Sequence, residues 1–403
     1  MRIVRFEIRK MLSDKLIWIA IVLIFILDSL IILTDHNDRA NIVYLNSIVD
    51  EVGCVINDES ITKMDRIYTD GFNELKRIYK QTMGLELQEL SDVFGYMSSY
   101  AEQGEKLEIL GRLIDTVTEL NNGNISFDKE SFNEKYRKDT NVLFGLVSKR
   151  LLNKRLSLSE KTGEVKYISV NMISDLSNLL YNKILPAIYA ETILLGILFI
   201  FRSLDFDIKN ETQAVVYSCM KGQKLKIYKM YACLISSFSC FLLISVFSLV
   251  FYYCYFPQYN FLLNPAAADF YPNQIPVFQI SSIGLLFLNL TTGFSAIAAF
   301  LIFAFSVGIL IKNTYIGFVT TLGSALLMPL NFVKTLKIPY NPIVLLFQYN
   351  ITDKSAVVNC KNWFLYSSDY LYLPLSELIV FGYLLVYGII CFLCMKYICR
   401  KDL

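Results

Sequence analysis

The sequence predicts an all-α polytopic membrane protein with six transmembrane helices, an amphipathic amino-terminal interfacial helix and a mostly helical extracellular domain between the first and second spans. Of the 403 residues, 54% are hydrophobic and only 18% are charged, whereas soluble domains average about 45–50% and about 25%. Six apolar runs each reach the ~20 helical residues needed to cross a bilayer. Lysine and arginine gather at alternate ends of these runs, as the positive-inside rule expects.

Composition also excludes several classes of function. The net charge of +2 provides no basic excess for binding nucleic acid, so we expect no nucleic-acid partner. The single histidine, His36, argues against a multi-histidine metal site or a Ser-His-Asp triad. Cys391 and Cys394 form a C-x-x-C inside an apolar run, where cysteine behaves as a small hydrophobe. We therefore expect no metal site and no catalytic residue.

Residues 1–15 are expected to form an amphipathic helix on the cytoplasmic face of the membrane. Its apolar face and its basic face are opposite each other on a helical wheel. The apolar residues are Val4, Ile8, Met11 and Leu12, and the basic ones are Arg2, Arg5 and Arg9. This pattern is typical of a helix that lies on anionic lipid, which makes membrane lipid an expected partner. The alternative is a basic start that only fixes the topology.

The six expected spans are residues 16–34, 184–201, 230–256, 282–311, 315–333 and 375–398. Basic residues precede the first span, lie between the second and third and between the fourth and fifth, and follow the sixth, so both termini and the tail 399–403 are predicted to be cytoplasmic. The loop 257–281 has no Lys or Arg and is placed outside, together with the loop 334–374, although the latter carries four lysines. Residues 282–290 could be an outer segment that leads into a span from about Thr291.

Residues 35–183 are predicted to form the extracellular domain. Apolar positions recur every three or four residues from Leu90 to Leu120 and stop at the sequence Asn121-Asn122-Gly123, and a second such stretch, 128–154, would complete a helical hairpin. Helices are also expected over 61–83 and 171–181, the latter running into the second span, and residues 156–170 could form a β-hairpin. The domain could handle substrate, bind a partner or act as a spacer.

Cys54 and Cys360 both fall in segments placed outside the membrane. A disulfide between them would connect the extracellular domain to the last outer loop. Such a bond needs a Cα separation of about 4.4–6.8 Å, and sequence provides no distance. A bridge and two unpaired thiols both stay open.

Asp28 and Glu191 lie within apolar runs. Carboxylates inside a membrane usually face the bundle interior or a watery path. At ~1.5 Å of rise per residue, both are at comparable depth, so the two could share a cavity. One interpretation is a substrate pathway, with a proton or cationic substrate at the carboxylates. The other is a structural pair hydrogen-bonded to Ser29, Thr192 or a tyrosine.

The cytoplasmic loop 202–229 is expected to contain a short helix over about Glu211–Met220. Asn210 can cap it, acidic residues occupy its positive end, lysines its negative end, and Gly222 suits a left-handed stop. The small apolar surface expected to bind a partner consists of Ala214, Val215, Cys219 and Met220.

In this loop the sequence resembles the membrane subunits of ATP-binding-cassette exporters of the type-2 family (ABC-2). Between spans two and three, these subunits have a segment with an acidic residue followed by threonine, then a serine and a glycine. A basic residue at the start of span three ends the segment. The matching residues are Glu211, Thr212, Ser218, Gly222 and Lys229. The amino-terminal helix and six spans fit the same family. The large insertion after span one resembles bacterial subfamilies that export, or give immunity to, peptides and antimicrobials.

The resemblance implies that ATP and Mg²⁺ are used by a separate ATP-binding-cassette ATPase subunit, and that a second permease subunit, identical or not, completes the transporter. The chain itself lacks the G-x-x-x-x-G-K-[ST] phosphate loop, so no cofactor is expected to bind to it. A different class of function is a membrane sensor or signalling anchor with an extracellular ligand-binding domain. An intramembrane enzyme has only Asp28 and Glu191 in its favour.

Overall fold

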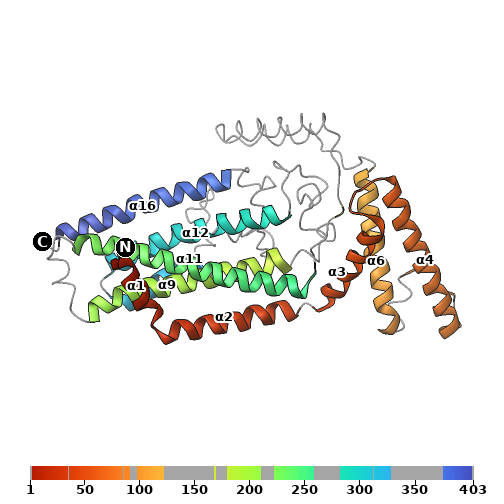
Figure 1. Cartoon of the computed structure of the whole chain (residues 1–403), viewed down its shortest axis with the longest axis horizontal. Helices are drawn as coiled ribbons and strands as arrows, with labels where there is room; N and C mark the ends of the chain where they lie inside the picture. Colours follow the sequence, from red (N-terminus) through yellow and green to blue (C-terminus); the bar gives the residue numbers. More distant parts are fainter. Residues whose placement is uncertain are drawn as a thin grey trace, which may run out of the picture. The chain divides into compact units, whose positions relative to one another are not determined.

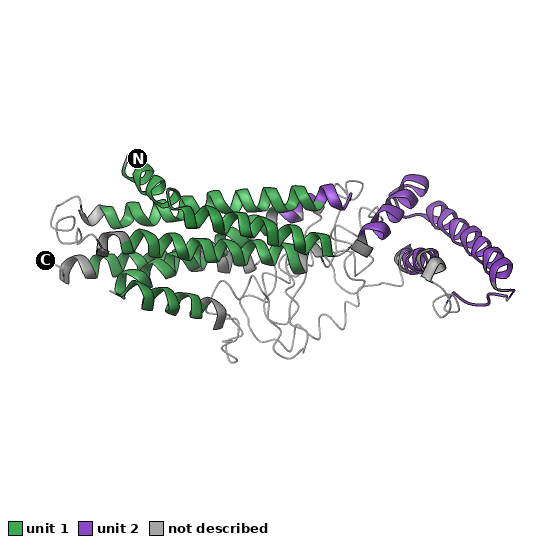
Figure 2. Cartoon of the chain, turned by 90° about the horizontal axis from the view of Figure 1, so that it is seen from below, with its two compact units in different colours: residues 1–34, 180–252, 287–403 green, residues 35–179, 253–286 purple. Residues whose placement is uncertain are grey.

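The computed structural model describes residues 2–34, 36–84, 86–90, 98–121, 168, 179–209, 222–257, 282–311, 313–327 and 375–401. Over these residues it contains ten α-helices, one π-helix and no strand, which confirms the predicted all-helical class. The chain divides into two compact units. Unit 1 comprises residues 1–34, 180–252 and 287–403, and unit 2 comprises residues 35–179 and 253–286 (Figure 2).

Unit 1 is a helical bundle. Its helices are α1 (Arg2–Leu12), α2 (Lys15–Thr34), α9 (Leu185–Lys209), α11 (Gly222–Tyr255), α12 (Ser282–Leu310), α13 (Thr314–Leu327) and α16 (Leu375–Lys401). Residues 253–255 of α11 and 282–286 of α12 belong to unit 2. Most of them run along the bundle, and α1 crosses one end (Figure 1). The start of α1 and the end of α16 lie at the same end of the unit in both views (Figures 1 and 2).

Four helices are long and apolar enough to cross a membrane: Lys15–Thr34, Leu185–Asp205, Leu225–Tyr255 and Asn289–Leu310. They correspond to the first four predicted spans. Helix α12 is continuous from Ser282, so residues 282–290 belong to the same helix as the span. Helix α13 covers part of the predicted span 315–333, whose residues 328–333 lie outside the described residues, and α16 covers the predicted span 375–398. The count of six spans therefore stays a prediction.

Helix α9 is the central helix of the bundle. In its most apolar stretch of 18 residues, 67% is buried inside the protein, against 28% in the corresponding stretch of α2. It packs against α1, α2 and α13. One face of α2 is not packed inside the bundle. Its large apolar side chains, such as Trp18, Leu23 and Leu30, are about half exposed. In a membrane-spanning helix, such a face is suited to lipid contact.

Close packing between α9 and α12 depends on Gly293. A Cβ at this position would lie 2.5 Å from the ring of Tyr189. That ring is 1% exposed, and its hydroxyl donates a hydrogen bond to the backbone carbonyl of Asn289 at 2.9 Å. The tyrosine therefore has little room to move away.

We expect Gly293→Ala to destabilise the bundle, because overpacking a tight core costs about 1–3 kcal/mol. The measurement is unfolding of the purified protein by sodium dodecyl sulfate in mixed micelles. Gly388→Ala on α16 is the matched control, since no atom of the described residues lies within 4 Å of the place its methyl group would take. Equal resistance of the two variants would contradict this packing.

Unit 2 contains α3 (His36–Val52), α4 (Asp58–Met83) and α6 (Ser98–Asn121). Its core consists of Leu75, Tyr79, Leu87 and Leu107, packed with Tyr68, Phe72 and Leu90. Helix α4 begins at a capping box, in which the Asn57 side chain accepts from the Ser60 N–H, and it ends at Gly84, whose φ of 69° is left-handed. Polar contacts join α6 to its neighbours: Glu105 accepts a hydrogen bond from Asn41 at 3.1 Å, and Asn121 donates one to Asp58 at 2.6 Å. Unit 2 is thus a small helical body with its own core.

The predicted helix 61–83 is confirmed as α4, which begins three residues earlier because of the Asn57 cap. Helix α6 ends at Asn121, where the pattern predicted a stop. Of the expected helix 171–181, only residues 179–181 are described, and they belong to a π-helix, Leu179–Ile184, that is joined to α9. Helix α3 was not predicted, since its sequence mixes polar and apolar residues evenly. The stretch 128–154 lies outside the described residues, as does 156–170 apart from Ile168.

The connection between the second and third spans is shorter than the predicted loop 202–229. Helix α9 extends to Lys209, and α11 begins at Gly222. Gly222 was expected to end a short helix, but it is the first residue of a long one, a position that tolerates glycine. Charged residues such as Arg202 and Lys224 made these turns look like a loop, although both helices simply continue beyond their apolar parts.

Candidate functional site

Helix α1 is docked on the bundle, which the sequence did not predict. Glu7 and Met11, one turn apart, are 4% and 1% exposed, whereas Phe6 is 65% exposed. The predicted helix is confirmed, but its most buried side contacts protein. Among the residues expected to face lipid, Val4, Ile8 and Leu12 are only half-buried. The apolar side chains of α1 that can contact lipid are therefore those other than Met11, which is buried against protein.

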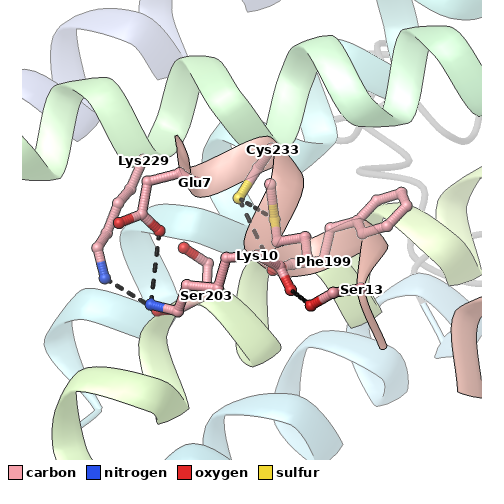
Figure 3. A network of polar contacts seen from close by, with 8 residues as sticks. Glu7, Lys10, Ser13, Phe199, Ser203, Lys229 and Cys233 are labelled. Atoms are coloured by element: carbon pink, nitrogen blue, oxygen red, sulfur yellow. Dashed lines mark hydrogen bonds and ion pairs between the residues drawn. The ribbon is translucent and has the colours of Figure 1, made fainter. Parts of the chain in front are cut away.

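A buried lysine connects α9 to α11 beside α1. Lys229 is 0% exposed, and its Nζ donates a hydrogen bond of 3.0 Å to the backbone carbonyl of Ser203. The Glu7 carboxylate lies in the same cluster (Figure 3), 3.6 Å from Lys10 Nζ. A fully buried ammonium is costly unless it is paired and hydrogen-bonded. We call the cluster of Glu7, Lys10, Ser203, Lys229 and Cys233 the α1 junction.

Further contacts hold the α1 junction together. Cys233 Sγ lies 3.9 Å from Met11 Sδ and 3.7 Å from the Phe199 carbonyl oxygen, as Figure 3 shows. At the end of α1, Asp14 forms an ion pair with Arg202 at 2.8 Å. Three helices are thus joined at one end of the bundle by apolar, polar and charged contacts together.

The residues of the predicted coupling segment are mostly outside the described part of the chain. This applies to Glu211, Thr212, Ala214, Val215, Ser218, Cys219 and Met220. Of the two remaining motif residues, Gly222 begins α11 and Lys229 lies in the α1 junction. The hydrogen bond from Lys229 to Ser203 therefore connects the two helices that lead into and out of residues 210–221.

The two carboxyl groups inside the bundle are in contact. Asp28 of α2 is 2% exposed and lies within hydrogen-bonding distance of Glu191 on α9. Ser248 of α11 forms a further hydrogen bond with Asp28. The two acids thus lie together, and a cavity that they share stays a prediction. The polar partner is Ser248, and Ser29 and Thr192 instead bond to carbonyls of their own helices.

Asp28 belongs to the stripe of α2 that packs inside the bundle. The other buried members of this stripe are Ile17, Ile21, Ile24 and Ile32. Next to it, the rings of Phe25 and Phe247 stack with centroids 4.1 Å apart. The carboxyl pair therefore lies on an apolar seam between α2, α9 and α11.

Sequence reasoning missed Glu7, Ser203 and Ser248. Glu7 could have been found, because it is the only acid in α1 and lies within about 60° of Met11 and Val4 on a helical wheel. Ser203 contributes a backbone carbonyl, which every residue has. Ser248 is one of several serines in α11, and nothing in their spacing distinguishes it.

Cys54 is a half-buried free thiol. Its carbonyl accepts a hydrogen bond of 2.8 Å from the Ile168 N–H. Cys360 lies outside the described residues, so a bridge between the two stays a prediction. Among the residues that the structure describes, no group of three or more His, Cys, Asp or Glu side chains could hold a metal ion.

Comparisons with protein families, with curated proteins and with solved structures find no match for this chain.

Proposed function

We propose that this chain is a membrane-spanning permease subunit of an ATP-binding-cassette exporter of the type-2 family. It would lie in the cell membrane with both termini in the cytoplasm and move a peptide, antimicrobial or other amphiphilic substrate outward. ATP and Mg²⁺ would be used by a separate ATPase subunit, and a second permease subunit would complete the transporter.

The observation that carries the proposal is the buried Lys229–Ser203 hydrogen bond. It joins the two helices on either side of residues 210–221, the segment that resembles the coupling element of that family. Lys229 itself is the basic residue of the motif. A force applied by a partner to residues 210–221 would therefore reach α9 and α11 together.

Helix α9 is suited to receive such a force. It is the most buried of the four apolar helices and packs against α1, α2 and α13. Movement of its end would displace several helices at once, which is how shear and rigid-body transitions spread through packed helices. Helix α1 starts and α16 finishes at the same end of unit 1 (Figure 1), which fits an even number of crossings, such as the six proposed.

The proposed orientation predicts which positions a membrane-impermeant maleimide can reach. In a chain with Cys54, Cys219, Cys254, Cys360 and Cys399 changed to serine, Thr69→Cys on α4 should react in intact cells. Ser13→Cys, between α1 and α2, should react only after the cells are permeabilised. Both positions are exposed in the structure, so burial would not explain a difference. Labelling of Ser13→Cys in intact cells would contradict the orientation.

Purification of the chain from its own membrane tests the proposed composition. We expect it to carry a stoichiometric subunit with a phosphate loop of the form G-x-x-x-x-G-K-[ST]. A histidine kinase or another regulator in place of this subunit would instead favour the sensor function.

A further inference from the structure

Asp28 and Glu191 form an acidic pair without a basic partner among the described spanning residues. Helix α12 and helix α13 contain no charged residue, and the lysines of α11 precede Met230. The groups that face Asp28 are Glu191 and the Ser248 hydroxyl, and no cation is among the groups that act on either acid. Two adjacent carboxylates in an apolar seam would repel each other and would each lose their hydration.

The hydrogen bonds of the pair require protons that the serine cannot supply alone. The Ser248 hydroxyl has one hydrogen, and its Oγ donates to the Ile244 carbonyl oxygen one turn earlier at 2.9 Å. Ser248 also contacts Asp28, and Asp28 contacts Glu191. A carboxylate only accepts hydrogen bonds, whereas a protonated carboxyl can donate one. A hydrogen bond between the two acids therefore needs a proton on one of them.

The second oxygen of Glu191 favours the same conclusion. Its Oε2 is buried and has no hydrogen-bond partner among the described residues. A charged oxygen in that position would be costly, while the carbonyl oxygen of a neutral carboxyl is tolerated more easily.

We propose that Asp28 and Glu191 form a proton-binding site, in which an exchangeable proton held between the two carboxyl groups keeps α2 against α9 and α11. Release of the proton places two negative charges side by side, so the seam opens or takes up water or a cation. This inference does not depend on the proposed function, because the site would bind a proton in a sensor as well as in an exporter.

Infrared spectroscopy of the purified protein tests the proton directly. At neutral pH we expect a carbonyl-stretch band of a protonated carboxyl that shifts down in D₂O and disappears as the pH is raised. The band should be lost or shifted in frequency in Asp28→Asn and in Glu191→Gln, because each variant removes one of the two carboxyl groups that hold the proton between them.

Glu7→Gln is the matched control. Glu7 is the other buried acid of unit 1 in the described residues, and it has Lys10 as an ion-pair partner. The variant should keep the band. A wild-type protein without the band at neutral pH would overturn the proposal, and so would a band that is lost in Glu7→Gln. Because the wild-type titration needs no variant, poor folding of a variant cannot leave the question open.

Cross-linking tests the connection to helix packing. In a chain without native cysteines, Phe25→Cys and Phe247→Cys replace the stacked rings of α2 and α11. The yield of their oxidative cross-link should fall by several-fold over the pH range in which the infrared band disappears. Thiols oxidise faster at high pH, so their chemistry alone would raise the yield. With Asp28→Asn and Glu191→Gln added, the yield should no longer fall. A yield that rises with pH in the otherwise wild-type seam would overturn the proposed role in holding α2.

Discussion

Val215→Asp is expected to abolish transport while the chain still inserts in the membrane. In the proposed exporter, Val215 lies on the apolar side of the predicted helix Glu211–Met220, which would dock in a groove of the ATPase subunit. A helix of this length is unstable alone in water, so docking is what would hold it. A buried, unpaired charge typically costs ~3–5 kcal/mol, which corresponds to a loss of affinity of about a hundredfold or more.

The measurement is the amount of ATPase subunit that co-purifies with the variant, together with its ATP hydrolysis. Tyr217→Asp is the matched control, because it adds the same charge on the opposite side of the predicted helix. That variant should retain the partner. If Val215→Asp retained both the partner and full transport, residues 210–221 would not be the coupling element.

Lys229→Met is expected to release α1 from the bundle. Methionine preserves most of the length of the lysine stem, but it cannot donate the 3.0 Å hydrogen bond to the Ser203 carbonyl. It also removes a positive charge from beside the buried Glu7 carboxylate (Figure 3). Losing a hydrogen bond to a charged group typically costs about 1.5–3 kcal/mol, a large part of the stability of an ordinary domain.

Cys233 reports on this release, because it is 2% exposed and contacts Met11 in the wild-type protein. Its reaction with a small maleimide in detergent should be slow in wild type and fast in Lys229→Met. Adding Glu7→Gln should restore part of the protection, since the buried Glu7 carboxylate, which then has only Lys10 as an ion-pair partner, is replaced by a neutral amide. Equal reactivity of Cys233 in wild type and Lys229→Met would show that Lys229 does not hold α1.

The sequence predicted those parts of the fold that follow from periodicity and composition. The four apolar spans are long runs that leave little alternative to a helix, and the end of α6 at Asn121 has an explicit stop signal. The extensions of α9 to Lys209 and of α11 from Gly222 were missed. Their polar turns are stabilised by contacts such as Asp14–Arg202, which come from elsewhere in the chain.

The sequence could predict residues of the candidate site only where the residue type costs free energy among its sequence neighbours, as a carboxylate does in an apolar run. Asp28 and Glu191 stand out because a carboxylate within an apolar run needs a reason, and comparable depth suggested that they could meet. The α1 junction has no such signature. Glu7 and Lys229 look like ordinary members of an amphipathic helix and of a basic loop, and only tertiary packing shows that both are buried.

ATP hydrolysis by the assembled transporter is the most direct test of the claim that this chain is an exporter permease. The ATPase subunit that co-purifies with the chain is measured alone and then together with the chain in lipid nanodiscs, with wild type and Val215→Asp compared. We predict that the wild-type chain raises the rate of hydrolysis several-fold and that Val215→Asp removes this stimulation. An identical rate with and without the wild-type chain would contradict the claim.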